Sequence, residues 1–469
     1  PCATPLLQGR ITRELLRTVA FRQDVASISI PPPVRDATYF WMGSVDFPAA
    51  HAGGVTGAGV SVASLDYRRP DDLQHLAGVG NVRIPDGIAS SHSTICASFV
   101  RQAAMPFGSA PGVTIHFANI LNPNGLADAD ANALAWARGL GVHVMYRPNS
   151  LLVLEPPPSP SDDWSVLQFP YPLIVASAGN RPVHNGIPYE VVGNTLYNGV
   201  VVGGSTDNYA RTDSRFDDVI WGSSSFQNPA SNHGDRELPE LVAPSDGIRS
   251  AATYDNNGTS LSAPIVAGAI ALLAQNSPFG LSAGNWPEAE KAILLASADC
   301  SVSGGLLNLS DTVDDKDGVG AFGVGTVLDI GNPAIARTNT NPTGRGFRYG
   351  HLSPSQFPGG LWNVVQQIST NDSGWLSVAM VWDATPVCGE ATCHGYGPDV
   401  DLNLVLFDPI SGTAVASSTS FDNSYEVIQA HLQPNRVYEL RVFADSWRLS
   451  GTYYGLAWNK TVQSCGGSL

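Results

Sequence analysis

The sequence predicts an α/β domain with a mostly parallel sheet, followed by an antiparallel β-sandwich. Between about residues 60 and 300, buried strand-like runs alternate with helical runs, which is typical of a parallel sheet covered by helices on both faces. From about residue 340 the pattern changes to short alternating runs separated by turn residues, which favours antiparallel strands. At 469 residues the chain exceeds what one core usually organises, so two domains are expected.

The expected elements follow from apolar runs and from the turn residues that separate them. Strands of the parallel sheet are expected at 60–65, 113–120, 142–146, 173–177 and 200–203. Helices are expected at 92–104, 127–138, 263–274 and 287–297. Strands of the sandwich are expected at 375–382, 400–407, 424–432 and 437–444. The proline-rich stretch between 147 and 164 is expected to be a stiff loop.

One short segment, Gly258-Thr259-Ser260-Leu261-Ser262-Ala263-Pro264, carries the strongest indication of function. It places Ser260 at the N-terminus of a helix made of small apolar residues, with Pro264 expected in the first turn. Free backbone N–H groups and the helix dipole stabilise an anion there, which is what a nucleophilic serine and its oxyanion need. The alternative is a core helix with an ordinary serine or threonine cap.

This segment resembles the serine motif of the subtilisin-like peptidases, and three further motifs of that family occur in the family's order. Ser64-Leu65-Asp66 ends an apolar strand, Ser91-His92-Ser93-Thr94 opens a helical run, and Ala178-Gly179-Asn180 ends a buried strand. The resemblance covers about residues 41 to 330. It implies a three-layer subtilisin-like domain, and it implies a jelly-roll form for the C-terminal sandwich, where Val381-Trp382-Asp383 is similar to a module of some bacterial subtilases.

The resemblance also implies a role for each motif residue. Ser260 is expected to attack the peptide carbonyl, His92 to transfer protons, and Asp66 to orient and stabilise the imidazole. Asn180 and the Ser260 N–H are expected to hold the oxyanion. Two flanks depart from the family pattern, since Asp66 is followed by Tyr67-Arg68 and His92 lies between serines. The alternatives are that Asp66 is a carboxylate with a turn role at the end of a strand and that His92 is an ordinary surface histidine. Asp71 and Asp72 are the rival candidates for the carboxylate of the triad.

Substrate contacts are expected at Tyr146, Arg147, Ala178 and Gly179. Tyr146-Arg147-Pro148 stands where the family has a Ser-x-Gly wall of the S1 pocket, and a proline cannot donate a backbone N–H to a substrate strand. Arg147 either favours an acidic substrate side chain or, as we prefer, pairs with Asp162 or Asp163. Leu261 replaces the methionine common in the family, which predicts tolerance of peroxide.

The predicted function is therefore a secreted serine endopeptidase acting on proteins or peptides. A second hypothesis is a catalytically weakened subtilase whose sandwich binds a protein or a glycan. A third is an acid peptidase of the sedolisin type, which His92 and Asn180 disfavour. The net charge of −16 without long charged blocks argues against nucleic acid and anionic membranes as partners, and a monomer is expected. Hydrophobic stretches are broken by polar residues, so no membrane insertion is expected.

The six cysteines favour an oxidising compartment. Cys388 and Cys393 enclose a short polar loop and are expected to form a local disulfide. Cys96 lies one helical turn after His92 and is expected to be a buried free thiol beneath the triad. Among the remaining three, a Cys2–Cys465 bridge is the preferred pairing, which leaves Cys300 free. The chain begins at Pro1 without a methionine, so we expect a trimmed or fragment form.

Three segments are expected along the chain. Residues 1–40 are an N-terminal extension or a propeptide remnant, 41–335 the catalytic domain, and 336–469 the sandwich. No cofactor is required for the chemistry, but structural calcium is possible because two acidic clusters offer the oxygen ligands that it takes. The candidate ligands are Asp311, Asp314, Asp315 and Asp317 in one cluster and Asp399 and Asp401 in the other. Solvated surface carboxylates are the alternative.

Overall fold

A computed structural model describes most of the chain from Phe40 to Thr461. The residues outside the description are 1–39, 84–87, 103–107, 121–127, 151–159, 182, 185–186, 189–190, 208–213, 251–252, 277–284, 301, 303–306, 312, 333–343, 359–362, 386, 389–392, 395–397 and 462–469. The expected N-terminal extension therefore lies outside the described residues, as do Cys2 and Cys465.

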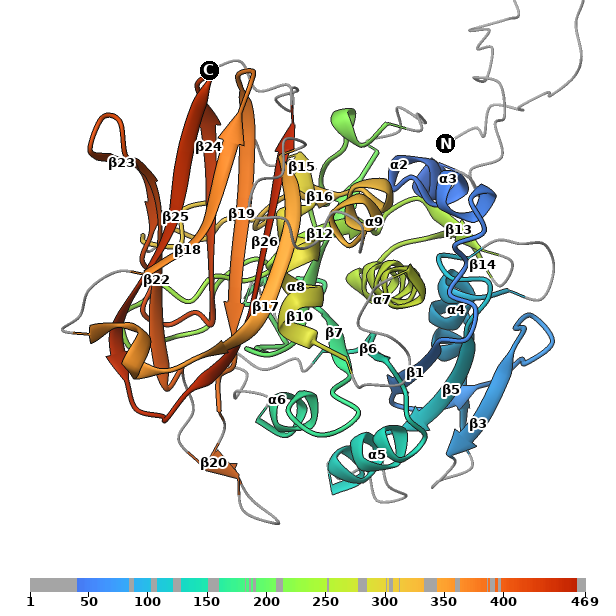
Figure 1. Ribbon diagram of the computed structural model, residues 1–469. Helices are drawn as coiled ribbons and strands as arrows, with labels where there is room; N and C mark the ends of the chain where they lie inside the picture. Colours follow the sequence, from blue (N-terminus) through green and yellow to red (C-terminus); the bar gives the residue numbers. More distant parts are fainter. Residues whose placement is uncertain are drawn as a thin grey trace, which may run out of the picture. The chain divides into compact units, whose positions relative to one another are not determined.

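The first part of the chain is built on one large sheet in the order β15-β16-β12-β10-β7-β6-β1-β5-β3 (Figure 1). Its pairs are parallel from β3 to β16, whereas β15 and the side strand β11 (Val219–Ile220) pair antiparallel. The strands run over β1 Ser61–Asp66, β3 Val79–Arg83, β5 Thr114–Asn119, β6 Val144–Arg147, β7 Leu173–Ser177, β10 Val200–Thr206, β12 Leu241–Pro244, β15 Ala298–Cys300 and β16 Ala321–Phe322. The five expected strands are confirmed.

Alternate residues of the central strands pack into different cores, as the twofold period of a strand requires. Val62 and Val144 belong to the core that contains helices α4 (Ser91–Val100) and α7 (Thr259–Asn276). Ala63 and Met145, their chain neighbours, pack in a second core with helix α5 (Asp128–Gly139). Figure 1 shows α4 and α7 on one side of the sheet and α5 on the other. The predicted three-layer α/β arrangement is confirmed.

Helix α7 begins earlier than its apolar run predicted, at Thr259 instead of Ala263. Pro264 therefore lies in the second turn, and the expectation of a first-turn proline was wrong. Because proline lacks an N–H, the carbonyl of Ser260 receives no i−4 hydrogen bond from it. The helix is made of small residues because its neighbours come close: a Cβ on Gly268 would overlap the Ser109 side chain.

The remaining helices are α2 (Phe40–Ser44), α3 (Phe47–Ala52), α6 (Pro160–Val166), α8 (Pro287–Ala296) and α9 (Val324–Ile330), with short 3₁₀ turns at Arg215–Asp217 and Pro354–Gln356. Helix α6 occupies the end of the stretch expected to be a loop, because Asp162 and Asp163 fall in its first turn and favour the positive end of the helix dipole. Two-stranded ribbons complete this part: β2 Arg69–Pro70 with β4 Ala89–Ser90, β8 Val183–His184 with β9 Ile187–Pro188, and β13 Ile248–Ser250 with β14 Thr253–Asn256.

The C-terminal part consists of two four-stranded antiparallel sheets, in the orders β17-β26-β19-β24 and β18-β25-β22-β23. Their strands are β17 Arg345–Leu352, β18 Asn363–Thr370, β19 Gly374–Trp382, β22 Val400–Asp408, β23 Thr413–Ser418, β24 Tyr425–Leu432, β25 Arg436–Trp447 and β26 Thr452–Thr461. Leu376, Leu404 and Leu440 from both sheets share one buried core. This arrangement confirms the predicted antiparallel sandwich.

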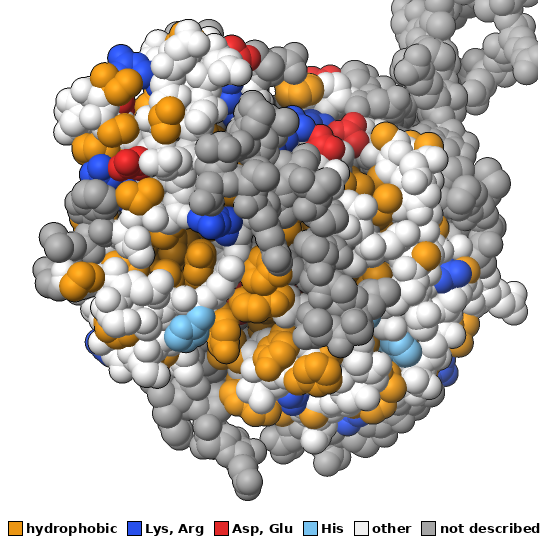
Figure 2. All heavy atoms as spheres, in the orientation of Figure 1, with side chains coloured by type: hydrophobic (Ala, Val, Ile, Leu, Met, Phe, Trp, Pro, Cys, Tyr) orange, Lys and Arg blue, Asp and Glu red, His pale blue; other side chains and the backbone are white. Residues whose placement is uncertain are grey.

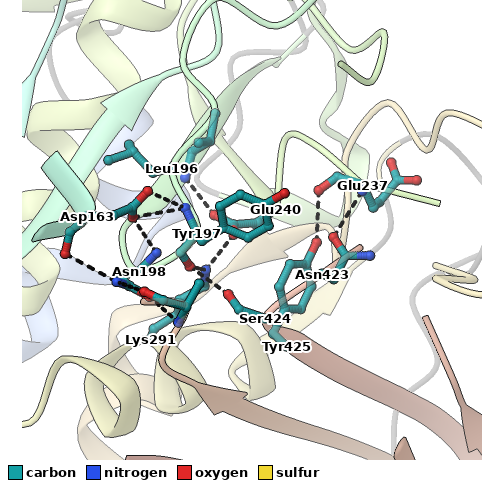
Figure 3. A network of polar contacts seen from close by, with 12 residues as sticks. Asp163, Leu196, Tyr197, Asn198, Glu237, Glu240, Lys291, Asn423, Ser424 and Tyr425 are labelled. Carbon is teal, nitrogen blue, oxygen red and sulfur yellow. Dashed lines mark hydrogen bonds and ion pairs between the residues drawn. The ribbon is translucent and has the colours of Figure 1, made fainter. Parts of the chain in front are cut away.

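The two parts of residues 38–469 form one compact unit. Every residue of α8 is buried, because its outer face packs against β26 and β19 of the sandwich. A charged side chain of this helix is consequently enclosed: Lys291 Nζ donates to Glu240 Oε1 at 2.5 Å and to the Tyr197 carbonyl at 2.8 Å (Figure 3). Ser424 from the sandwich donates to the same carbonyl at 2.9 Å.

A small ribbon, β20 (Val387–Cys388) with β21 (Cys393–His394), pairs Cys388 directly opposite Cys393. The side chains of Cys300, Cys388 and Cys393 lie outside the description, so the expected disulfide stays a prediction. Helix α7 has the length and composition of a membrane span, but 89% of that stretch is buried inside the protein.

Candidate active site

Asp66 and His92 are positioned by neighbouring elements at the carboxyl edge of the sheet. Asp66 is the last residue of β1, and His92 lies in the first turn of α4. The His92 Nδ1 atom lies 3.0 Å from Asp66 Oδ2, and the Tyr67 N–H donates to Asp66 Oδ1 at 2.7 Å. The carboxylate side chain is 3% exposed and the imidazole 44% exposed. A buried, oriented carboxylate therefore holds one ring nitrogen, while nearly half of the imidazole side chain stays exposed.

Cys96 lies beneath this pair as the sequence predicted, a fully buried free thiol. Its Sγ lies 3.6 Å from His92 Nε2. The pKa of His92 is raised, most by the charge of an ionised Cys96 and further by the Asp66 hydrogen bond. Burial raises the pKa of the Cys96 thiol. The thiol is therefore neutral at neutral pH, and Asp66 is then the group that favours the imidazolium.

Ser260 is the second residue of α7 and is 8% exposed. The glycine before Thr259 leaves space beside it: a Cβ on Gly258 would lie 3.0 Å from Ser260 Oγ and 3.3 Å from Asn180 Nδ2. Gly258 has a φ of 144°, which an L residue rarely adopts. The serine hydroxyl and the Asn180 amide thus border one small space that only a glycine leaves open.

The Asn180 amide is oriented by Thr259. Asn180 Oδ1 accepts hydrogen bonds from the Thr259 N–H at 2.9 Å and from Thr259 Oγ1 at 2.8 Å. Thr259 Oγ1 in turn accepts the Gly179 N–H at 3.0 Å. With the amide oxygen occupied by donors, the NH₂ group faces the Gly258 space. The sequence predicted no separate role for Thr259, although its position next to Ser260 in the serine motif was a signal that it contributes to the site.

The rival carboxylates have other partners. Asp71 Oδ1 accepts the Thr94 hydroxyl at 2.6 Å, and the Thr94 oxygen accepts the N–H groups of Asp71 and Asp72. Asp72 lies 3.3 Å from His75 at the surface. These contacts tie the loop after β1 to the start of α4, which supports the pairing of Asp66 with His92.

The four expected substrate-binding residues have different environments. Tyr146 is fully buried in the main core. Arg147 is 5% exposed, and its Nη2 donates to Asp162 Oδ1 at 2.6 Å, which is the pairing that the sequence favoured. Ala178 and Gly179 lie at the end of the strand beside the nucleophile, where the Gly179 carbonyl accepts the Ser225 N–H at 2.9 Å.

The first acidic cluster does not converge on one point. Asp311 Oδ1 accepts the Val313 N–H, Asp314 Oδ1 the Asn228 N–H, and Asp317 Oδ2 the Val302 N–H. Asp315 Oδ2 accepts the Asn308 N–H, and burial raises the pKa of Asp315 to about 6. These carboxylates therefore accept hydrogen bonds from backbone N–H groups of several different segments. In the second cluster, Asp399 lies near Arg448, whereas Asp401 faces a different group of acids.

Known proteins are similar to half or more of this chain. The profile of the subtilase family matches residues 63–351. Subtilisin Savinase of Lederbergia lenta is 29% identical over 251 residues, covering 50% of this chain and 83% of that protein. An alkaline protease of Alkalihalobacillus alcalophilus is 29% identical over 251 residues, covering 50% of this chain and 59% of that protein. The solved structure of the prenylagaramide maturation protease PagA has a TM-score of 0.45 and 19% identity, covering 60% of this chain and 97% of that one.

The chain belongs to the subtilase family, because the family profile spans more than half of it. It is accordingly a serine endopeptidase, and its substrates are proteins or peptides.

Proposed function

We propose that Ser260, His92, Asp66 and Asn180 carry out the peptidase chemistry. In the first step Ser260 Oγ attacks the scissile carbonyl carbon while His92 Nε2 accepts the hydroxyl proton. Asp66 Oδ2 accepts the hydrogen bond of the Nδ1–H, which fixes the tautomer and stabilises the imidazolium. The imidazolium then protonates the leaving amine. Water attacks the acyl-enzyme with His92 again as the base.

The tetrahedral intermediates carry a negative oxygen that needs preorganised donors. In this proposal, Asn180 Nδ2 and the Ser260 N–H donate to that oxygen in the space beside Gly258. The observation that carries the proposal is this joint position: the hydroxyl and the amide border one space. The 3.0 Å Asp66–His92 pair provides the second support. The serines on either side of His92 do not disturb the contact between Asp66 and His92. The unusual neighbours of His92 therefore do not favour a catalytically weakened enzyme.

A fluorophosphonate probe tests the assignment directly. It should label the native protein on Ser260 alone, and Ser260→Ala should abolish both labelling and hydrolysis of a denatured protein. Ser355→Ala, at an exposed serine of the sandwich, is the control and should behave as wild type. Folded protein that neither reacts with the probe nor hydrolyses a denatured substrate would instead favour the binding-module hypothesis. Labelling at another residue would refute the assignment of Ser260.

We also propose that the protein is secreted and monomeric, with no nucleic-acid partner. On the face drawn in Figure 2, basic side chains are scattered instead of gathered into a patch, and the chain has 25 basic against 41 acidic residues. Thiol titration of the denatured, unreduced protein should find two free thiols. Six free thiols would contradict the disulfides on which secretion rests.

A further inference from the structure

Three aspartates that are distant in sequence meet where the parallel-sheet part contacts the sandwich. Asp235 lies in the loop before β12, Asp401 is the second residue of β22, and Asp422 lies in the turn before β24. Their exposed fractions are 7%, 5% and 6%, so each is more than nine-tenths buried. His233 lies beside them with a side chain that is 54% exposed. The sequence places Asp401 beside Asp399 and gives no sign of its nearness to Asp235 and Asp422.

Two of these carboxylates hold the loop and the turn together. Asp235 accepts the N–H groups of Phe421 and Asp422 at 2.9 and 3.0 Å. Asp422 accepts the His233 N–H at 2.6 Å, and its other oxygen lies 2.9 Å from His233 Nδ1. The ligand atoms of His233, Asp235 and Asp422 all lie within 4.8 Å of one another.

Asp401 adds a further buried carboxylate beside this group. Its Oδ1 is buried and has no hydrogen-bond partner among the described residues. The acids Asp445, Asp235 and Asp422 and the imidazole of His233 all lie close enough for their charges to act on Asp401. Arg236, the nearest basic residue along the loop, directs its guanidinium to Asn423 and the Leu196 carbonyl instead. Buried negative charges of this kind require protons or a cation.

We propose that Asp235 and Asp422 bind one divalent cation, with His233 at the solvent side of the site and Asp401 as a further buried carboxylate beside it. Oxygen and imidazole ligands lie about 2.0–2.6 Å from such ions, so a shared ion keeps ligand atoms within roughly 4–5 Å of each other. The ligand atoms of His233, Asp235 and Asp422 satisfy this geometry, because they all lie within 4.8 Å of one another. The bound ion joins the loop before β12 to the turn before β24 of the sandwich. Carboxylates alone suit Ca²⁺, whereas participation of the imidazole selects Mn²⁺ or Zn²⁺.

The test uses the full chain carrying Ser260→Ala, which prevents self-digestion. After treatment with a chelator and desalting, CaCl₂, MnCl₂ or ZnCl₂ is titrated calorimetrically, and thermal unfolding is followed at each concentration. We expect one of the three ions to bind and to raise the unfolding midpoint by on the order of a few degrees. His233→Ala should weaken Mn²⁺ or Zn²⁺ and leave Ca²⁺ unchanged, which distinguishes the ions.

Asp401→Asn should lower the affinity at least about tenfold and remove the shift of the midpoint. Asp399→Asn is the matched control, because Asp399 lies two residues away beside Arg448, and it should respond as the parent does. In the parent protein, Mn²⁺ binding at this site should also broaden the ring-proton NMR signals of His233, a readout that needs no folded variant. No response to any ion, or an undiminished response in Asp401→Asn, would overturn the proposal. Stabilisation of the chelated protein by Asp401→Asn without any ion response would show protons in place of the cation.

Discussion

Gly258→Ala is the most informative single change at the candidate active site, because the structure defines what the added methyl group meets. The Cβ would lie 3.0 Å from Ser260 Oγ and 3.3 Å from Asn180 Nδ2, in the space assigned to the oxyanion. The backbone at this position has a φ of 144°, so an alanine there also costs on the order of 1–3 kcal/mol in strain. The substitution therefore acts on the transition state and on the backbone together.

The expected effect on turnover can be estimated from the donors that the methyl group displaces. Loss of one oxyanion donor costs about 10²–10³ in kcat, a figure that comes from subtilisin itself, a relative of this chain. Because the methyl group separates the Asn180 amide from the oxyanion position and also crowds the nucleophilic Ser260 hydroxyl, we expect at least this loss. KM should change much less, since the donors act on the intermediate more than on the bound substrate.

The assay measures kcat and KM on a chromogenic peptide. Far-ultraviolet circular dichroism confirms that the variant is folded. Gly139→Ala is the matched control: this glycine is exposed at the end of α5, and a Cβ there meets nothing within 4 Å. If folded Gly258→Ala keeps kcat within about tenfold of wild type, a difference of about 1.4 kcal/mol, the oxyanion does not occupy this space.

Three further predictions concern stability and oxidation. Burial raises the pKa of Glu426 to about 8, so the folded protein binds this proton more tightly than the unfolded chain does. That contribution to stability is complete below about pH 4.5 and disappears as the pH rises to about 8. Glu426→Gln should therefore flatten this part of a plot of unfolding free energy against pH. An unchanged slope in the variant would contradict the prediction. Lys291→Met should lower the free energy of unfolding, measured with denaturant, by about 3–5 kcal/mol, because it leaves Glu240 buried without its cation. A decrease of less than about 1 kcal/mol would refute this prediction. Wild-type activity should survive peroxide, whereas Leu261→Met should be inactivated faster; equal inactivation rates would remove Leu261 as the cause.

The sequence predicted the central layers well because their signals are local. Apolar runs such as 173–177 are buried on both faces, so a continuous hydrophobic stretch identified the strand to the residue. The half-exposed edge strand β3 contains glycine and asparagine, and no local pattern distinguished it from a turn. For helix α7 the hydroxyl residues Thr259, Ser260 and Ser262 hid its true start. Burial of a hydroxyl depends on a partner elsewhere, such as the Ala243 carbonyl for Ser262.

The burial of charged residues at the junction between the two parts could not be predicted from the sequence. Helix α8 has the composition of an amphipathic surface helix, yet all its residues are buried because the sandwich covers its polar face. Lys291 is stabilised there by Glu240 and by the Tyr197 carbonyl, and Ser424 of the sandwich donates to that same carbonyl (Figure 3). A buried ammonium group of this kind is tolerated only while its partners stay in place and water stays out. The sandwich therefore serves as a structural part of the peptidase fold, because removing it would expose α8 and separate Ser424 from the carbonyl that both side chains share.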